Sequence, residues 1–61
     1  MDIVFVEYIE TSKFGKIAHF VDSKGNNIYS KILYKDEVIY YQELSSNELE
    51  TVKDEIHDKK S

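Results

Sequence analysis

Residues 2–11, DIVFVEYIET, are a run of β-branched and aromatic residues in which Glu7 and Glu10 are the only interior charges. This composition and length are typical of a β-strand. Successive side chains of a strand point to opposite faces of the sheet. The predicted division is Ile3, Phe5 and Ile9 on one face, and Val4, Val6 and Tyr8 on the other. A strand that is apolar on both faces has to be covered on both.

Three further segments have strand composition and are separated by polar turns: residues 16–22, 27–35 and 37–42. Gly15 follows the first polar turn, where a bulge or a positive φ is expected. Asp22 and Gly25 stand at the first and fourth positions of a type I turn closed by a left-handed glycine. Asp36 and Glu37 supply a tight polar connection into the fourth strand.

A helix is predicted over residues 46–58. Ser45 and Glu48 have the spacing of a capping box, and Leu44 and Leu49 the spacing of a hydrophobic staple. The apolar stripe of this helix is narrow, because it consists of Leu49 and two further residues, Val52 and Ile56. Such a stripe packs on one surface only.

Together these elements predict an α+β fold. We expect one small domain over residues 1–61, in which a four-stranded antiparallel β-meander is followed by one C-terminal α-helix packed on one face. The helix covers one face of the sheet, so the other face has to meet a partner. In so short a chain without cysteine, a homodimer is one such solution.

Composition narrows the functional classes. The net charge is −4, and all eight basic residues are lysines. The lack of arginine, the preferred residue for bidentate phosphate contacts, counts against nucleic-acid binding. No apolar run reaches the ~20 residues of a membrane span and no leader pattern is present, so we expect a soluble, cytoplasmic protein. The bias toward Lys, Asn and Ile is common in small phage or mobile-element proteins.

We do not expect an enzyme. His19 and His57 are the only histidines, and neither has a nucleophile at a recognisable spacing. The adjacent acids, such as Asp36 and Glu37, point apart in a strand or a helix and do not form an acid–base pair. No glycine-rich phosphate loop and no metal-ligand cluster is present in the sequence, so we expect no cofactor and no metal.

The candidate partner-binding residues are aromatic and acidic. The third and fourth strands are rich in tyrosine, a residue enriched at interface hot spots, and Tyr29, Tyr40 and Tyr41 are the candidate anchors. On the helix, acids recur every four residues and form a row that can meet a basic surface. This acidic row consists of Glu50, Asp54 and Asp58.

The sequence therefore predicts a small acidic protein that acts by protein–protein binding, as an inhibitor or regulator of a host protein. One version is a phage protein whose acidic row imitates the phosphates of nucleic acid and is bound by a nucleic-acid-binding enzyme. Two alternatives stay open. The first is a single-stranded nucleic-acid-binding module that uses strand tyrosines and lysines. The second is a structural homodimer or assembly subunit.

Overall fold

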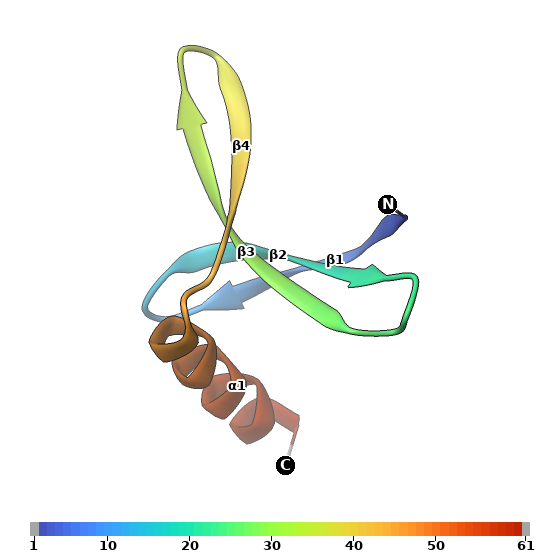
Figure 1. Cartoon of the computed structure of the whole chain (residues 1–61). Coiled ribbons are helices and arrows are strands. Elements are labelled where there is room, and N and C mark those ends of the chain that lie inside the picture. The colour runs from blue at the N-terminus through green and yellow to red at the C-terminus, as the bar shows by residue number, and fades with distance from the viewer. Residues whose placement is uncertain (1, 61) are drawn as a thin grey trace.

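The computed structural model describes residues 2–60, and the side chains of residues 2–57. Its elements are, in chain order, β1 (Ile3–Thr11), β2 (Gly15–Asp22), β3 (Asn27–Lys35), β4 (Val38–Glu43) and α1 (Ser46–Lys60) (Figure 1). The strands form one antiparallel sheet in the order β1-β2-β3-β4. The prediction of an α+β meander followed by one helix is confirmed.

The first two strand connections are closed by local turn chemistry. After β1, the Thr11 hydroxyl donates to the carbonyl oxygen of Gly15 at 2.8 Å, and Gly15 has a φ of 68°. After β2, the Gly25 amide donates to the carbonyl oxygen of Asp22 at 3.0 Å, with a φ of 87° at Gly25. Both glycines adopt the left-handed conformation that glycine allows without steric cost. The expected reversal at Asp22 and the expected positive φ at Gly15 are confirmed.

β1 contains a β-bulge at Val6. Phe5 is paired with Phe20, but Glu7 is already paired with His19, so one residue of β1 has no partner on β2. Phe5 and Tyr8 consequently share a face of the sheet, with ring centroids 4.8 Å apart. The strict alternation predicted from the sequence placed them on opposite faces, and it is wrong here because a bulge adds one residue to one strand only.

The hydrophobic core lies between α1 and one face of the sheet, which we call the helix-side face. Ile17 and Val52 are completely buried, and Leu44 is nearly so. Partly buried side chains surround these three, namely Ile9, Phe14, Tyr29, Leu49 and Ile56. The predicted helical stripe is therefore the surface that α1 buries.

Polar contacts fix where α1 begins and how it lies on the sheet. The Ser45 amide donates to Glu48 Oε1 at 2.9 Å and the Glu48 amide donates to Ser45 Oγ at 3.3 Å, which confirms the predicted capping box. Glu48 also accepts from Lys31 Nζ of β3 at 2.7 Å. Further along the helix, Glu55 accepts from the amide and the hydroxyl of Ser12. The helix is thus attached to β3 and to the β1–β2 turn.

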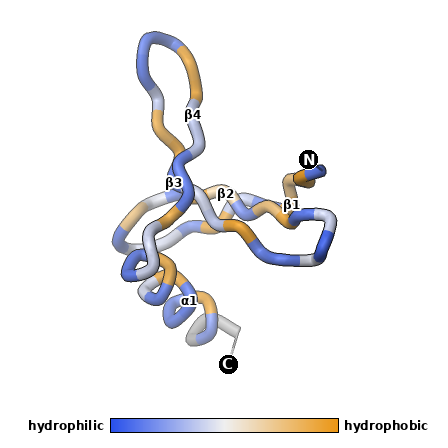
Figure 2. The backbone as a smooth tube through the Cα atoms, in the orientation of Figure 1, coloured by the Kyte–Doolittle hydropathy of each residue, from blue (hydrophilic) through white to orange (hydrophobic). Residues whose placement is uncertain are grey.

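The opposite face, which we call the open face, is not covered by any element between residues 2 and 60 (Figure 1). Part of the β3–β4 hairpin also projects away from α1, and hydrophobic residues continue along it (Figure 2). Many large apolar side chains of β1, β3 and β4 are between 42% and 71% exposed: Ile3, Val4, Phe5, Val6, Tyr8, Leu33, Tyr34, Val38, Ile39, Tyr40 and Tyr41.

The β3–β4 turn yields a test of stability. Asp36 and Glu37 have φ values of 53° and 64°, the type I′ pattern in which glycine is preferred at the second position. A left-handed conformation costs a residue such as glutamate roughly 1 kcal/mol. We expect Glu37→Gly to raise the free energy of unfolding by about 1 kcal/mol, and the midpoint of thermal unfolding by roughly 4–8 °C, as measured by circular dichroism.

Glu43→Gly is the matched control for this substitution. It makes the same change at the last residue of β4, which is still paired with Ser30 of β3 and where glycine weakens a strand, so it should lower the midpoint. A midpoint for Glu37→Gly that is equal to or below that of the wild-type protein would contradict the strain assigned to the turn.

Candidate binding surfaces

Four aromatic rings form a connected cluster on the open face, which we call the ring cluster: Phe5, Tyr8, Phe20 and Tyr41. Phe20 contacts Phe5 at a centroid distance of 5.7 Å and Tyr41 at 5.3 Å, in both cases edge to face. This geometry is the preferred one for aromatic pairs. The ring cluster joins the consecutive strands β1 and β2 to β4, from which β3 separates them in the sequence.

Two small residues lie at the centre of the open face. Ala18 is paired with Tyr8 on one side and with Ser30 on the other, and both small residues are buried. Next to them is a hollow of about 470 Å³. Its lining is mostly apolar and consists of Ile3, Phe20, Ile28, Ser30, Tyr41 and Glu43. The open face thus presents a ring cluster beside a hollow. A packed interface needs such a combination of a protruding and a recessed surface.

The ring cluster is held together by a polar contact as well. The hydroxyl groups of Tyr8 and Tyr41 form a hydrogen bond, and this bond, with partial burial, raises the pKa of Tyr41 above its ordinary value of 10. Lys16 Nζ lies 5.3 Å from the centre of the Tyr8 ring, within cation–π range. The phenol rings are therefore fixed in orientation while about half of each remains exposed.

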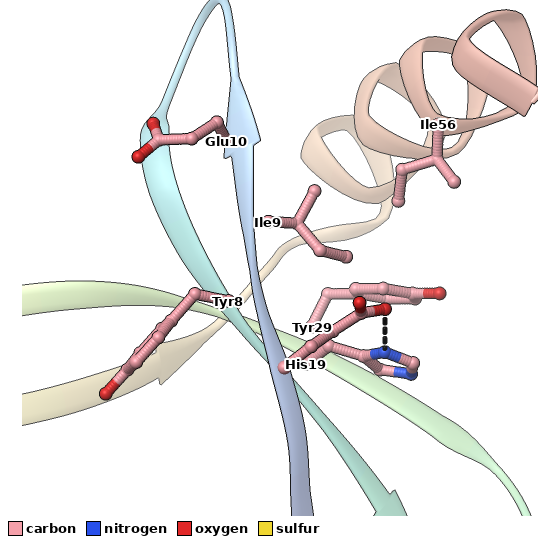
Figure 3. Close-up of a pocket in the computed structure, with 7 residues that line it drawn as sticks. Tyr8, Ile9, Glu10, His19, Tyr29 and Ile56 are labelled. Carbon is pink, nitrogen blue, oxygen red and sulfur yellow. Dashed lines mark hydrogen bonds and ion pairs between the residues drawn. The ribbon is translucent and has the colours of Figure 1, made fainter.

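A second hollow, of about 310 Å³, opens between β1 and α1 (Figure 3). Figure 3 shows Ile9, Tyr29 and Ile56 on one side of β1, and Tyr8 on the other. The His19 ring stacks on Tyr29 with centroids 4.6 Å apart. Burial, and then the negative charge of Glu7, raise the pKa of Tyr29. This hollow is an extension of the core with a polar border.

His19 gains polar neighbours that the sequence does not reveal. Its Nδ1 lies 3.4 Å from Glu7 Oε2 and its Nε2 lies 2.9 Å from Asn27 Oδ1. Both ring nitrogens are therefore engaged within the protein, which suits a structural histidine better than a proton acceptor for a substrate. Among the side chains of residues 2–57, no three potential ligands are grouped as a metal ion would require.

The structure divides the sequence-predicted binding residues between the two faces. Tyr29 packs against the core on the helix-side face. Tyr41 is paired with Ile32 and belongs to the ring cluster, whereas its neighbour Tyr40 is paired with Leu33 on the helix-side face. Glu50 and Asp54 are exposed on α1. The side chain of the sixth residue, Asp58, lies outside the described residues.

Sequence reasoning missed the strongest feature of the open face. It did not nominate Phe5, Tyr8 or Phe20, since only the bulge at Val6 brings the first two to the same face. Val6 is β-branched and gives no local sign of a bulge, which a glycine would have given. The contact between Phe5 and Phe20 becomes visible only when the register of β1 on β2 is known.

Comparisons with known proteins do not assign the chain to a family. No protein-family model, curated protein or solved structure is significantly similar to the chain. Among the described residues, no helix has both the length and the apolar character needed to cross a membrane. Functional proposals therefore depend on the surfaces described above.

The Tyr8–Tyr41 hydrogen bond can be tested by titration. We expect Tyr8→Phe to move the pKa of Tyr41 back toward 10, because phenylalanine keeps the ring but removes the hydroxyl. Because the pKa is raised in the folded protein, the stabilisation from this bond is complete below pH 10 and is lost as the pH rises through the folded-state pKa. NMR titration of the tyrosine ring resonances measures this shift.

Tyr29 is the internal control in the same spectra. Burial and Glu7, rather than Tyr8, raise the pKa of Tyr29, so its titration should not change in Tyr8→Phe. If Tyr41 titrates identically in the two proteins, the hydroxyl contact does not hold the ring cluster together.

Proposed function

We propose that this chain is a small, acidic, non-enzymatic binding protein that contacts another protein through its helix-side surface. This surface has two parts. One is the projecting hairpin with Leu33, Val38 and Tyr40; the other is the exposed side of α1 with Glu50 and Asp54. The first part offers apolar contact area, and the second offers exposed negative charge.

The observation that carries this proposal is the exposure of the hairpin. Leu33 and Tyr40 are cross-strand partners, and Val38 is paired with Lys35 two positions along β3. The exposed fraction is 42% for Leu33, 50% for Tyr40 and 47% for Val38. A two-stranded ribbon with apolar side chains on its surface is marginally stable by itself. An exposed apolar patch is characteristic of a protein contact site.

Charge supports a partner with a basic surface. Glu48 is engaged by Lys31 and Glu55 by Ser12, so these two acids serve the fold. Glu50 and Asp54 are exposed one helical turn apart, and like charges at that spacing disfavour an isolated helix. A basic partner would relieve that repulsion. The finer version of the proposal is an inhibitor or regulator of phage or mobile-element origin that acts in the host cytoplasm by imitating nucleic-acid phosphates.

Single-stranded nucleic acid is the alternative occupant. Exposed rings accompanied by Lys16 on the open face favour it, because bases stack on such rings. The distribution of lysines weighs against it, since Lys31 lies on the helix-side surface in an ion pair with Glu48. Fluorescence anisotropy with a labelled oligothymidine decides the matter. Micromolar binding that weakens steeply as salt rises would replace the proposal of a protein partner.

The proposal predicts which substitutions abolish partner binding. In affinity purification from the native host, Tyr40→Ser should lower the affinity for the co-purifying protein by about tenfold or more, as for a hot-spot residue. Glu50→Lys combined with Asp54→Lys should slow association and remove its dependence on salt. Binding of the purified pair is measured by surface plasmon resonance.

Tyr34→Ser is the matched control. It removes the same ring from the same hairpin, but Tyr34 is paired with Ile39 on the open face. Binding should survive this change. Equal losses for Tyr34→Ser and Tyr40→Ser, or full binding by the Tyr40→Ser protein, would be evidence against a helix-side contact surface.

A further inference from the structure

We propose that the open face docks a second copy of this chain, so that two sheets pack face to face with the helices on the outside. The inference concerns the face opposite the helix-side surface and does not depend on the partner proposed above. It joins the ring cluster and the adjacent hollow into one interface.

The exposed area of the chain is the first argument. A monomeric globular protein of 7.2 kDa exposes about 4,100 Å². This chain exposes 4828 Å². The excess of about 700 Å² is close to the ~800 Å² that each partner contributes to a stable protein interface. The chain therefore has the surface of one half of an assembly.

The shape of the chain agrees with this surplus. Its radius of gyration is 11.9 Å, whereas about 10.5 Å is expected for a compact domain of this length. The projecting hairpin accounts for the extension (Figure 1). A second copy against the open face would cover one side of this hairpin and make the assembly more compact than either copy alone.

The open face supplies the apolar area that such a dimer needs. Six of its large apolar side chains are at least 45% exposed: Ile3, Phe5, Tyr8, Tyr34, Ile39 and Tyr41. With roughly 200 Å² for each whole side chain, together they expose about 600 Å². This area is similar to the excess, so the open face by itself can account for most of it.

The relief of the open face suits a two-fold axis. A two-fold interface uses the same patch on both copies, so the patch has to be complementary to itself. Here the ring cluster stands beside a hollow of about 470 Å³ whose floor includes the small residue Ser30. A two-fold axis between the ring cluster and the hollow would bring the rings of each copy over the hollow of the other copy.

The charges on the open face lie at its margins. Glu10 is paired with Lys16 at one end of β1, and the Asp22 carboxylate accepts from the Lys24 and Asn26 amides of the turn. Glu43 borders the hollow on β4, the last strand of the sheet, where it can stay in contact with water. Apart from the buried Ser30, the centre of the face is therefore apolar.

The acidic row favours the same arrangement. With a net charge of −4, two copies repel each other where their acids approach. Glu50 and Asp54 lie on α1, on the far side of the sheet from the open face. Two stacked sheets are ~10 Å apart, and this separation alone exceeds the ~8 Å screening length at physiological salt. Docking through the open face thus keeps Glu50 and Asp54 of the two copies apart.

Sedimentation equilibrium over a range of protein concentrations tests the dimer. We expect the mass of the wild-type chain to rise from that of one chain to that of two. Ile3→Glu places a carboxylate at the rim of the hollow, so it should raise the dissociation constant by about tenfold or more. Circular dichroism establishes that the variant is folded.

Val4→Glu is the matched control. Val4 is the next residue of β1, is 60% exposed and is paired with Val21 rather than with an open-face residue. Its dissociation constant should stay within about twofold of the wild-type value. A monomer at every concentration up to millimolar overturns the proposal, as does a dimer that Val4→Glu weakens as much as Ile3→Glu. Either result leaves the helix-side binding test intact.

A second measurement does not depend on any variant. In a mixture of isotope-labelled and unlabelled wild-type chains, filtered NOE spectra report only contacts between copies. We expect contacts from the rings of Phe5, Tyr8 and Tyr41. Intermolecular contacts confined to Tyr40 and α1 would place a dimer on the helix-side surface and overturn the proposal.

Discussion

The rest of the structure depends on one packing constraint, namely that a single 15-residue helix covers only one face of a sheet that is apolar on both. Val52 and Ile17 are fully buried at the contact, and Leu44 closes it where the chain leaves β4. Beyond the reach of the helix, apolar side chains remain in water. A small scaffold normally needs further burial or cross-links to be stable. The uncovered apolar surface thus follows from the whole architecture and not from the composition of one strand.

The two faces differ in chemistry, and this difference separates their proposed roles. The helix-side surface combines the aliphatic and phenolic hairpin with exposed carboxylates, which suits a partner of opposite charge. The open face combines fixed aromatic rings with a hollow and keeps its charges at the border. An arrangement of this kind allows both surfaces to be occupied at once, because the sheet separates them.

Local interactions were the predictable part of the fold. The capping box of Ser45 and Glu48 and the turn from Asp22 to Gly25 involve neighbours in the sequence, and both occur as expected. Contacts that depend on register were not predictable. The bulge at Val6 changes which side chains of β1 share a face, and the pairing of β3 with β4 decides that Tyr41, and not Tyr40, lies on the open face. For the candidate site, the sequence therefore predicted the aromatic and acidic residue types, but not which of these residues lie together on one face.

The two edge strands of the sheet, β1 and β4, differ in regularity. This difference limits how the sheets of two molecules can pair edge to edge. β4 pairs with β3 without interruption, and as an edge strand it has no strand neighbour on its other side. A regular edge strand is a template on which another strand can pair. β1 is kinked at Val6, and a kinked border is a poor template for another strand. Lateral growth can therefore join two molecules at β4 and then has no receptive border left. The bulge at Val6 thus disfavours an open-ended filament, which is the usual hazard of a sheet this apolar.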